Sequence, residues 1–214
     1  MKARFRDLGR LEYKAAWDEQ LLEHQLVVSG GPDTLIFVEH PPVLTLGASF
    51  DAKNLLLSEE DYASRGISLE RTDRGGDVTY HGPGQLVIYP IFNVSRHGRD
   101  LHKWMRDLEE TMILTCQRLG VEANREPEVN TGAWVNGKKI AAIGVKVRKW
   151  VSLHGVALNC DLDLSVFNLF VPCGVRTHGV TSLSHVLGKE FTIDEAKSIV
   201  RESFSEVFGL TFDE

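Results

Sequence analysis

The chain has 214 residues, of which 43% are hydrophobic and 25% are charged, as in an ordinary soluble globular protein. This composition excludes disordered, collagen-like and low-complexity classes, and the length favours one domain over residues 1–214 with its own core. The formal net charge of −6 argues against non-specific nucleic-acid binding, which requires a basic surface.

Helical patterns occur in four segments of the chain. They are predicted at 13–29, 58–66, 101–119 and 192–209. In the first helix, Trp17, Leu21 and Val28 are expected to form the buried face. Ser58 and Asp100 are expected to cap the second and third helices, and a capping box of the S/T-x-x-E type opens the last one.

Extended segments alternate with these helices without a strict order. Strands are predicted at 4–8, 35–38, 43–46, 67–71, 86–94, 133–147 and 151–158. Asn136-Gly137 lies inside one of these segments and is a strong signal for a tight hairpin. Mixed strand order with separate helices predicts an α+β fold around a mostly antiparallel or mixed sheet, with the C-terminal helix assigned to a small lobe.

The three cysteines indicate a reducing compartment. Their number is odd and none shares a C-x-x-C spacing, so neither a disulfide framework nor a zinc site is expected. Cys116 is predicted to lie in the core and Cys160 to be structural. The N-terminus lacks the apolar region of a secretory signal and no stretch is long and apolar enough to cross a membrane, so we expect a cytoplasmic protein with no membrane partner.

A glycine-rich segment at 74–85 is the first candidate for chemistry. Its sequence is R-G-G-D-V-T-Y-H-G-P-G-Q, with four glycines that allow a ligand to approach the backbone closely. It does not match a P-loop or a dinucleotide-binding fingerprint. The alternative is a glycine-rich surface connection that carries polar residues by chance.

Two lysines follow the hairpin turn, in G-K-K-I-A-A-I-G at 137–144. Strand alternation places Lys139 on one face with Ala141 and Ile143, and Ala142 on the other. Apolar neighbours would partly desolvate Lys139 and favour its neutral form, whereas Lys138 would face water. The alternative is that both lysines are solvated.

Cys173 lies between a proline and a glycine, in a turn, which makes it a candidate nucleophile or else a small buried hydrophobe. His81 and His154 are further candidate site residues, and the alternative for each is an ordinary hydrogen-bonded or exposed histidine. No role is assigned to His178 from its position. The remaining histidines, His40 among them, are interpreted as surface or structural.

Taken together, these motifs resemble the lipoyl(octanoyl) transferases, the octanoyl-[acyl-carrier-protein]–protein N-octanoyltransferase family. The resemblance rests on the two segments above together with L-H-G-V-A-L-N at 153–159 and P-C-G at 172–174, in this order. It implies a fold like the catalytic domain of biotin and lipoate protein ligases, with a larger and a smaller sheet flanked by helices.

The resemblance also implies a reaction and a set of site residues. An octanoyl group would move from octanoyl-acyl carrier protein, through a thioester on Cys173 that Lys139 activates, to a lysine of a lipoyl domain. Acceptors would be the E2 subunits of 2-oxoacid dehydrogenases and the H protein of glycine cleavage, with no ATP, metal or other cofactor. The implied substrate-binding residues are Arg74, Gly75, Gly76, Asp77, Val78, Thr79, Tyr80, His81, Ala142, Ile143, Gly144, Gly155, Val156 and Ala157.

Three other functions remain open. A lipoate or biotin protein ligase would activate its acid with ATP, a Cys/His hydrolase would use His81 or His178 as base, and a silent module would bind lipoyl domains without catalysis. Because an acidic enzyme has to dock an acidic carrier protein, a local basic patch is also predicted. Its candidate residues are Arg96, Arg99, Lys103, Arg106, Lys146, Arg148 and Lys149.

Overall fold

Residues 1–172 and 178–213 are described in the computed structural model, and they form two β-sheets. The large sheet has eight strands in the order β11-β1-β2-β6-β10-β9-β8-β7, and the small sheet has the order β4-β3-β5. Each sheet contains parallel and antiparallel pairs. The strands are β1 (Lys2–Arg10), β2 (Asp33–Glu39), β3 (Val43–Leu46), β4 (Ser68–Arg71), β5 (Val78–His81), β6 (Gln85–Ile91), β7 (Asn124–Glu126), β8 (Asn130–Val135), β9 (Lys138–Arg148), β10 (Val151–Asn159) and β11 (Thr211–Asp213).

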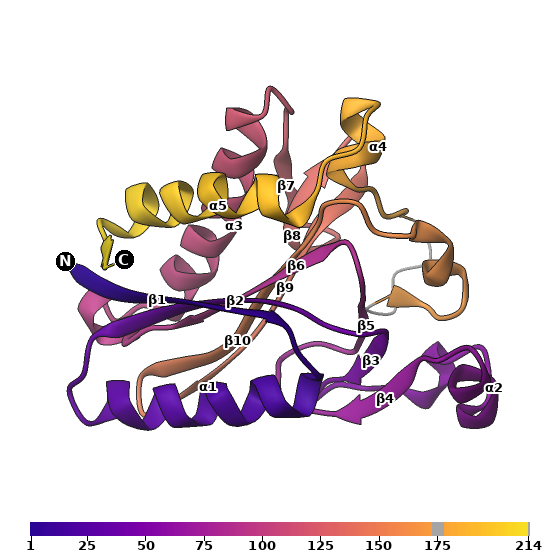
Figure 1. The fold of residues 1–214 in the computed structure, drawn as a ribbon, viewed down its shortest axis with the longest axis horizontal. Coiled ribbons are helices and arrows are strands. Elements are labelled where there is room, and N and C mark those ends of the chain that lie inside the picture. Colours follow the sequence, from indigo (N-terminus) through magenta and orange to yellow (C-terminus); the bar gives the residue numbers. More distant parts are fainter. Residues whose placement is uncertain (173–177, 214) are drawn as a thin grey trace.

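Helices cover both faces of the large sheet, with α1 on one face and α3 and α5 on the other (Figure 1). The helices are α1 (Tyr13–Val28), α2 (Glu59–Ser64), α3 (Leu101–Arg118), α4 (Leu183–Leu187) and α5 (Ile193–Phe208). This arrangement of a large mixed sheet, a small sheet and flanking helices confirms the predicted α+β class. Within the described chain, none of the helices has the length and apolar character that crossing a bilayer requires.

The predicted helix and turn signals are confirmed. The Ser58 and Asp100 side chains accept hydrogen bonds from backbone N–H groups of the first turns of α2 and α3. A complete capping box of Thr192 and Glu195 begins α5. Asn136 and Gly137 both have positive φ, at 50° and 73°, and they join β8 to β9 as a tight hairpin turn.

Helix α1 has the predicted length, but its predicted buried face is only partly right. Trp17 and Leu21 are half-buried, and Leu21 packs against the core, whereas Val28 is 36% exposed. Gln20 and Glu23 are buried instead. The Gln20 side chain accepts a hydrogen bond from the backbone N–H of His154, and Glu23 accepts one from Thr34. A hydrophobic pattern does not reveal buried polar side chains with such partners in the sheet.

Two other local predictions are also corrected. The C-terminal helix α5 does not belong to a small lobe, because its apolar face packs against α3 on the large sheet. Residues Val78–His81, expected as part of a glycine-rich connection, form strand β5 and pair with β3. The small sheet therefore stands beside the large one and carries a third of the glycine-rich segment as regular structure (Figure 1).

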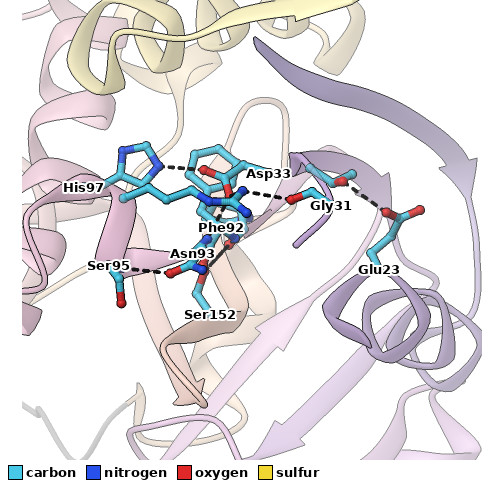
Figure 2. A network of polar contacts seen from close by, with 11 residues as sticks. Glu23, Gly31, Asp33, Phe92, Asn93, Ser95, His97 and Ser152 are labelled. Atoms are coloured by element: carbon cyan, nitrogen blue, oxygen red, sulfur yellow. Dashed lines mark hydrogen bonds and ion pairs between the residues drawn. The ribbon is translucent and has the colours of Figure 1, made fainter. Parts of the chain in front are cut away.

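A buried carboxylate braces the start of β2, as Figure 2 shows. Asp33 accepts hydrogen bonds from the backbone N–H of Asn93 at 2.9 Å, from Arg96 at 3.0 Å and from His97 at 2.7 Å. The Asp33 side chain is completely buried, and Arg96 also donates to the Gly31 carbonyl. These residues, called the Asp33 network below, attach the short helical turn Val94–His97 to the large sheet.

Candidate active site

Pairs of small residues form the floor of a hollow on the α1 side of the large sheet. Ala157 of β10 pairs with Ala142 of β9, and Gly155 pairs with Gly144. Since side chains alternate along a strand, these two pairs lie on one face and leave space above it. The hollow encloses about 580 Å³ including its open mouth. It is lined by Tyr13, Arg74, Gly75, Gly76, Thr79, His81, Val87, Tyr89, Asn130, Lys139, Ala142, Ile143, Gly144, His154, Gly155, Val156 and Ala157.

The loop that carries Arg74 and Gly75 forms the roof of this main hollow. The buried Arg74 guanidinium donates to the carbonyl oxygens of Thr45, Gly75 and Asp77, at 2.5–3.0 Å. A side chain at Gly144 would place its Cβ 3.0 Å from the Gly75 carbonyl oxygen, so glycine is needed for this close approach. The arginine is therefore a structural brace that holds the roof on the sheet.

Lys139 lines the hollow because strand β9 contains a β-bulge. Lys139 pairs with Trp134, and the next pair along the ladder skips Ile140, which is an extra residue. The extra residue changes the phase of the side chains, so Lys139 and Ala142 face the same space. The alternation expected from the sequence, with these two residues on opposite faces, is wrong for this reason.

The Lys139 side chain is held in place by its neighbours. Its Nζ donates to the Thr131 carbonyl at 3.2 Å and lies 4.8 Å from the centroid of the Trp134 ring, a cation–π contact. Gly132 leaves room for the stem, because a Cβ there would lie 3.3 Å from Lys139 Cε. Lys138, by contrast, is exposed. Of the two lysines, only Lys139 is therefore positioned within a site.

A second hollow meets the first at Lys139. Thr79, Lys139 and Ala142 line both. The residues that line only the second are Gln85, Trp134, Asn159, Phe167, Pro172, His178, Gly179 and Val180. Pro172 and His178, the described residues on either side of 173–177, both line this second hollow. Cys173 itself lies outside the described residues.

Two neutral histidines lie at the main hollow: His81 lines it, and His40 lies behind the lining, in contact with Tyr13, His81 and Tyr89. Burial lowers the pKa of His40 to about 4 and that of His81 to about 3. His81 Nδ1 lies 2.7 Å from the Gln85 carbonyl oxygen Oε1, and the Gln85 amide nitrogen donates to the Tyr80 carbonyl and to Asn159. Because Gln85 Oε1 can only accept, His81 carries its proton on Nδ1 and leaves Nε2 as an acceptor.

His154 connects the floor of the hollow to its roof. It has a positive φ of 59°, and its backbone N–H donates to Gln20. Nε2 donates to Asp73 at 2.8 Å, and Nδ1 lies 3.4 Å from the Tyr13 hydroxyl. Burial lowers the pKa of His154 although the Asp73 carboxylate opposes this, so the neutral ring accepts from Tyr13. Asp73 also forms an ion pair with Arg148.

The structure brings most of the predicted site residues together. Lys139 and all the predicted substrate-binding residues line the main hollow, except for three in the glycine-rich segment. Asp77 accepts hydrogen bonds from the Asp51 backbone and from Asn54. Val78 and Tyr80 point into the core of the small sheet, because side chains alternate along β5.

Sequence reasoning missed three residues that line the main hollow. Tyr13 comes from α1, Tyr89 from β6 and Asn130 from β8, and each lines the main hollow. In the sequence, each of these residues looks like an ordinary structural residue of its own helix or strand. Only contacts between distant elements, such as the bond from the Tyr89 hydroxyl to His40 at 2.8 Å, identify them.

The cysteines inside the described residues do not supply a nucleophile. Cys116 and Cys160 are buried, as predicted, and burial raises the pKa of each thiol to about 12. A thiol with such a pKa carries almost no thiolate near neutral pH. In residues 1–172 and 178–213, no three His, Cys, Asp or Glu side chains are grouped as ligands for a metal ion.

Several residues of the predicted basic patch are engaged with acidic partners. Arg96 pairs with Asp33, Lys103 with Asp107, Arg106 with Glu109 and Arg148 with Asp73. Arg99 lies over the Trp150 ring instead. These ion pairs reduce the field that such a patch would present to an acidic partner.

Comparison with known proteins agrees with this arrangement. The lipoyl protein ligase A/B catalytic domain family matches residues 11–205. The octanoyltransferase of Flavobacterium johnsoniae is 41% identical over 225 residues, with 97% of each chain covered. That of Rubrobacter xylanophilus is 47% identical over 207 residues, which cover 94% of this chain and 91% of the relative.

Solved structures share the fold at low identity. Lipoate-protein ligase A bound with ATP superposes with a TM-score of 0.82 at 21% identity, covering 100% of this chain and 88% of the ligase. Biotin protein ligase from Aquifex aeolicus gives a TM-score of 0.56 at 12% identity, covering 98% and 70%. The predicted likeness to biotin and lipoate protein ligases is thereby confirmed at the level of the fold.

Proposed function

This chain belongs to the lipoyl protein ligase A/B catalytic domain family, and from this we propose that it is an octanoyltransferase of protein lipoylation. It takes the octanoyl group from octanoyl-acyl carrier protein, holds it as a thioester on Cys173, and passes it to a lysine of a lipoyl domain. The acceptors are E2 subunits of 2-oxoacid dehydrogenases and the glycine cleavage H protein. The reaction takes place in the cytoplasm, where thiols stay reduced.

The observation that carries the proposal is the position of Lys139 between two hollows. The main hollow has an apolar floor of alanine and glycine that suits an alkyl chain. The second hollow contains Pro172, the residue before Cys173 in the sequence. An acyl group with its chain in the main hollow would therefore have its carbonyl carbon near Lys139 and the Cys173 segment.

In the first half-reaction, the Cys173 thiolate attacks the carbonyl carbon of the donor thioester. A new C–S bond forms, the bond to the carrier's pantetheine sulfur breaks, and that sulfur leaves as a thiolate that takes up a proton. A free thiol has a pKa of about 8.5, so only a few per cent is ionised at neutral pH. Lys139 favours the thiolate, either as a nearby ammonium or as the acceptor of the thiol proton.

In the second half-reaction, the neutral amine of the acceptor lysine attacks the Cys173 thioester. A C–N bond forms, the C–S bond breaks, and the amine proton passes through Lys139 back to the Cys173 sulfur. Because a thioester is already activated, the exchange needs no ATP, metal or other cofactor.

Intact-protein mass spectrometry after mixing the enzyme with octanoyl-carrier protein, without ATP or acceptor, tests the proposal. We expect one added octanoyl group, mapped to Cys173 and released as octanoyl-lipoyl domain when the acceptor is supplied. Cys173→Ser should abolish the adduct. Lys139→Met should slow acylation by about 10²–10⁴-fold, and the matched variant Lys138→Met should acylate like the wild type.

Other results would overturn the proposal in recognisable ways. Product that forms only with ATP would identify a ligase, the activity of the structural neighbour that was solved with ATP. Octanoate released to water without an acceptor would identify a hydrolase. Binding of lipoyl domains with no acylation under any condition would identify a silent module.

A further inference from the structure

The residues that line the main hollow are partly exposed at Lys139 and almost completely buried at Tyr13. Lys139, Thr79 and Ala142 border both hollows, whereas Tyr13, Tyr89 and His154 border only the main one. Along β10, Ala157 lies opposite Ala142, and His154 follows three residues away. Three residues of strand span about 10 Å, which is the scale of an extended medium-length acyl chain.

The Tyr13 ring is fixed at this buried end from several sides. It stacks on His81 with ring centroids 6.0 Å apart and planes 10° apart, and it meets the His40 ring edge at 5.3 Å. Its hydroxyl lies 3.4 Å from His154 Nδ1, and His154 in turn donates to Asp73. Only 3% of Tyr13 is exposed, and these contacts hold the ring in place beside the hollow.

We propose that Tyr13 determines the longest acyl chain that the enzyme accepts. This inference rests on the proposed function and adds a residue from α1, outside the glycine-rich, lysine and cysteine segments. A chain that fits ends with its methyl group against the Tyr13 ring. A longer chain has to displace a ring that is held by two stacked or edge-on histidines and by the bond to His154.

The preference for chain length then has two parts with different origins. Below the limit, each methylene buried in the hollow improves binding about fourfold. Above the limit, the Tyr13 ring acts as a steric stop, so the next methylenes lose binding instead of gaining it. Substitution of Tyr13 should therefore change the longest chain that is accepted, without changing the gain in binding per methylene for shorter chains.

The test measures transfer from acyl-carrier proteins of 6 to 14 carbons to a lipoyl domain, with wild type, Tyr13→Ala and Tyr13→Phe. For Tyr13→Ala we expect the preferred chain to lengthen, with the ratio of kcat/KM for 10 over 8 carbons rising about 15-fold, that is fourfold for each of two methylenes. Tyr13→Phe keeps the ring and should keep the wild-type preference.

Each outcome has one meaning. If wild type transfers octanoyl but Tyr13→Ala keeps the same preference, Tyr13 is not the stop. If Tyr13→Phe shifts the preference as far as Tyr13→Ala, the hydroxyl bond and not the ring sets the limit. If Tyr13→Ala does not fold, Tyr13→Leu replaces it, with a smaller shift in the same direction expected. If wild type transfers no acyl chain at all, the proposed function fails instead.

Discussion

Two buried polar networks lie at opposite ends of strand β2, and they differ in how fully their groups are paired. At its first residue, the Asp33 carboxylate accepts from a backbone N–H, an arginine and a histidine. Just beyond its last residue, His40 donates to the Leu11 carbonyl at 2.7 Å and lies 2.8 Å from the Tyr89 hydroxyl. The second network continues through Tyr13 to His81 and His154.

The difference distinguishes a network that borders the candidate active site from one that only stabilises the fold. Asp33 and its partners line neither hollow beside Lys139. In the second network the rings are neutral, and His81 Nε2 makes no hydrogen bond within residues 1–172 and 178–213. A saturated charged network stabilises a fold, whereas a neutral one with an unused acceptor can form the wall of a site.

The largest stability effect is expected for Asp33→Ala. It leaves His97, Arg96 and the Asn93 N–H without their buried acceptor, so the free energy of unfolding should fall by about 3–5 kcal/mol. Urea denaturation measures this loss. The folded fraction should keep the wild-type preference for acyl chain length, because the Asp33 network lines neither hollow.

Asp213→Ala is the matched control for that experiment. The ion pair between Lys2 and Asp213 is exposed, so removing it should cost less than about 1 kcal/mol. Equal losses for the two aspartates would show that burial and pairing do not decide the effect. If Asp33→Ala does not fold at all, Asp33→Asn gives a milder form of the same comparison.

The sequence predicted one part of the site and neither of the two networks. The residues that line the open part of the hollow come from short runs, such as Ala142–Gly144, which a motif can identify. Other lining residues come from α1, β5, β6 and β10, and they meet only in three dimensions. The position of Lys139 depends on a one-residue bulge at Ile140, which no hydrophobic pattern contains.

Acid should destabilise the protein through the histidines at the hollow. Burial holds the pKa of His40 at about 4, below the ordinary value of 6.5, so the unfolded chain binds a proton first as the pH falls. The contribution of His40 to stability is therefore intact above pH 6.5 and is lost progressively down to about pH 4.

The variant His40→Gln isolates this contribution. An amide can still donate to the Leu11 carbonyl and accept from the Tyr89 hydroxyl, but it does not titrate. Between pH 7 and pH 5, wild type should lose about 2 kcal/mol more unfolding free energy than the variant, measured by urea denaturation at each pH. Identical pH profiles would show that His40 binds its proton equally readily in the folded and the unfolded chain.

Among the buried groups, the smallest effect is expected for Tyr89→Phe, which removes one hydrogen bond from the second network. Because His40 Nδ1 donates to Leu11, the Tyr89 hydroxyl donates to His40 Nε2, and the variant leaves that nitrogen without its donor. The loss should be about 1 kcal/mol, measured by urea denaturation, since the ring still packs and water in the adjoining hollow can replace the hydroxyl. A loss as large as that of Asp33→Ala would mean that the two networks are equally closed to water. The expected loss is small because Tyr89 lies at the hollow, where water can take the place of its hydroxyl. The polar wall of the hollow therefore does not depend on any single hydrogen bond.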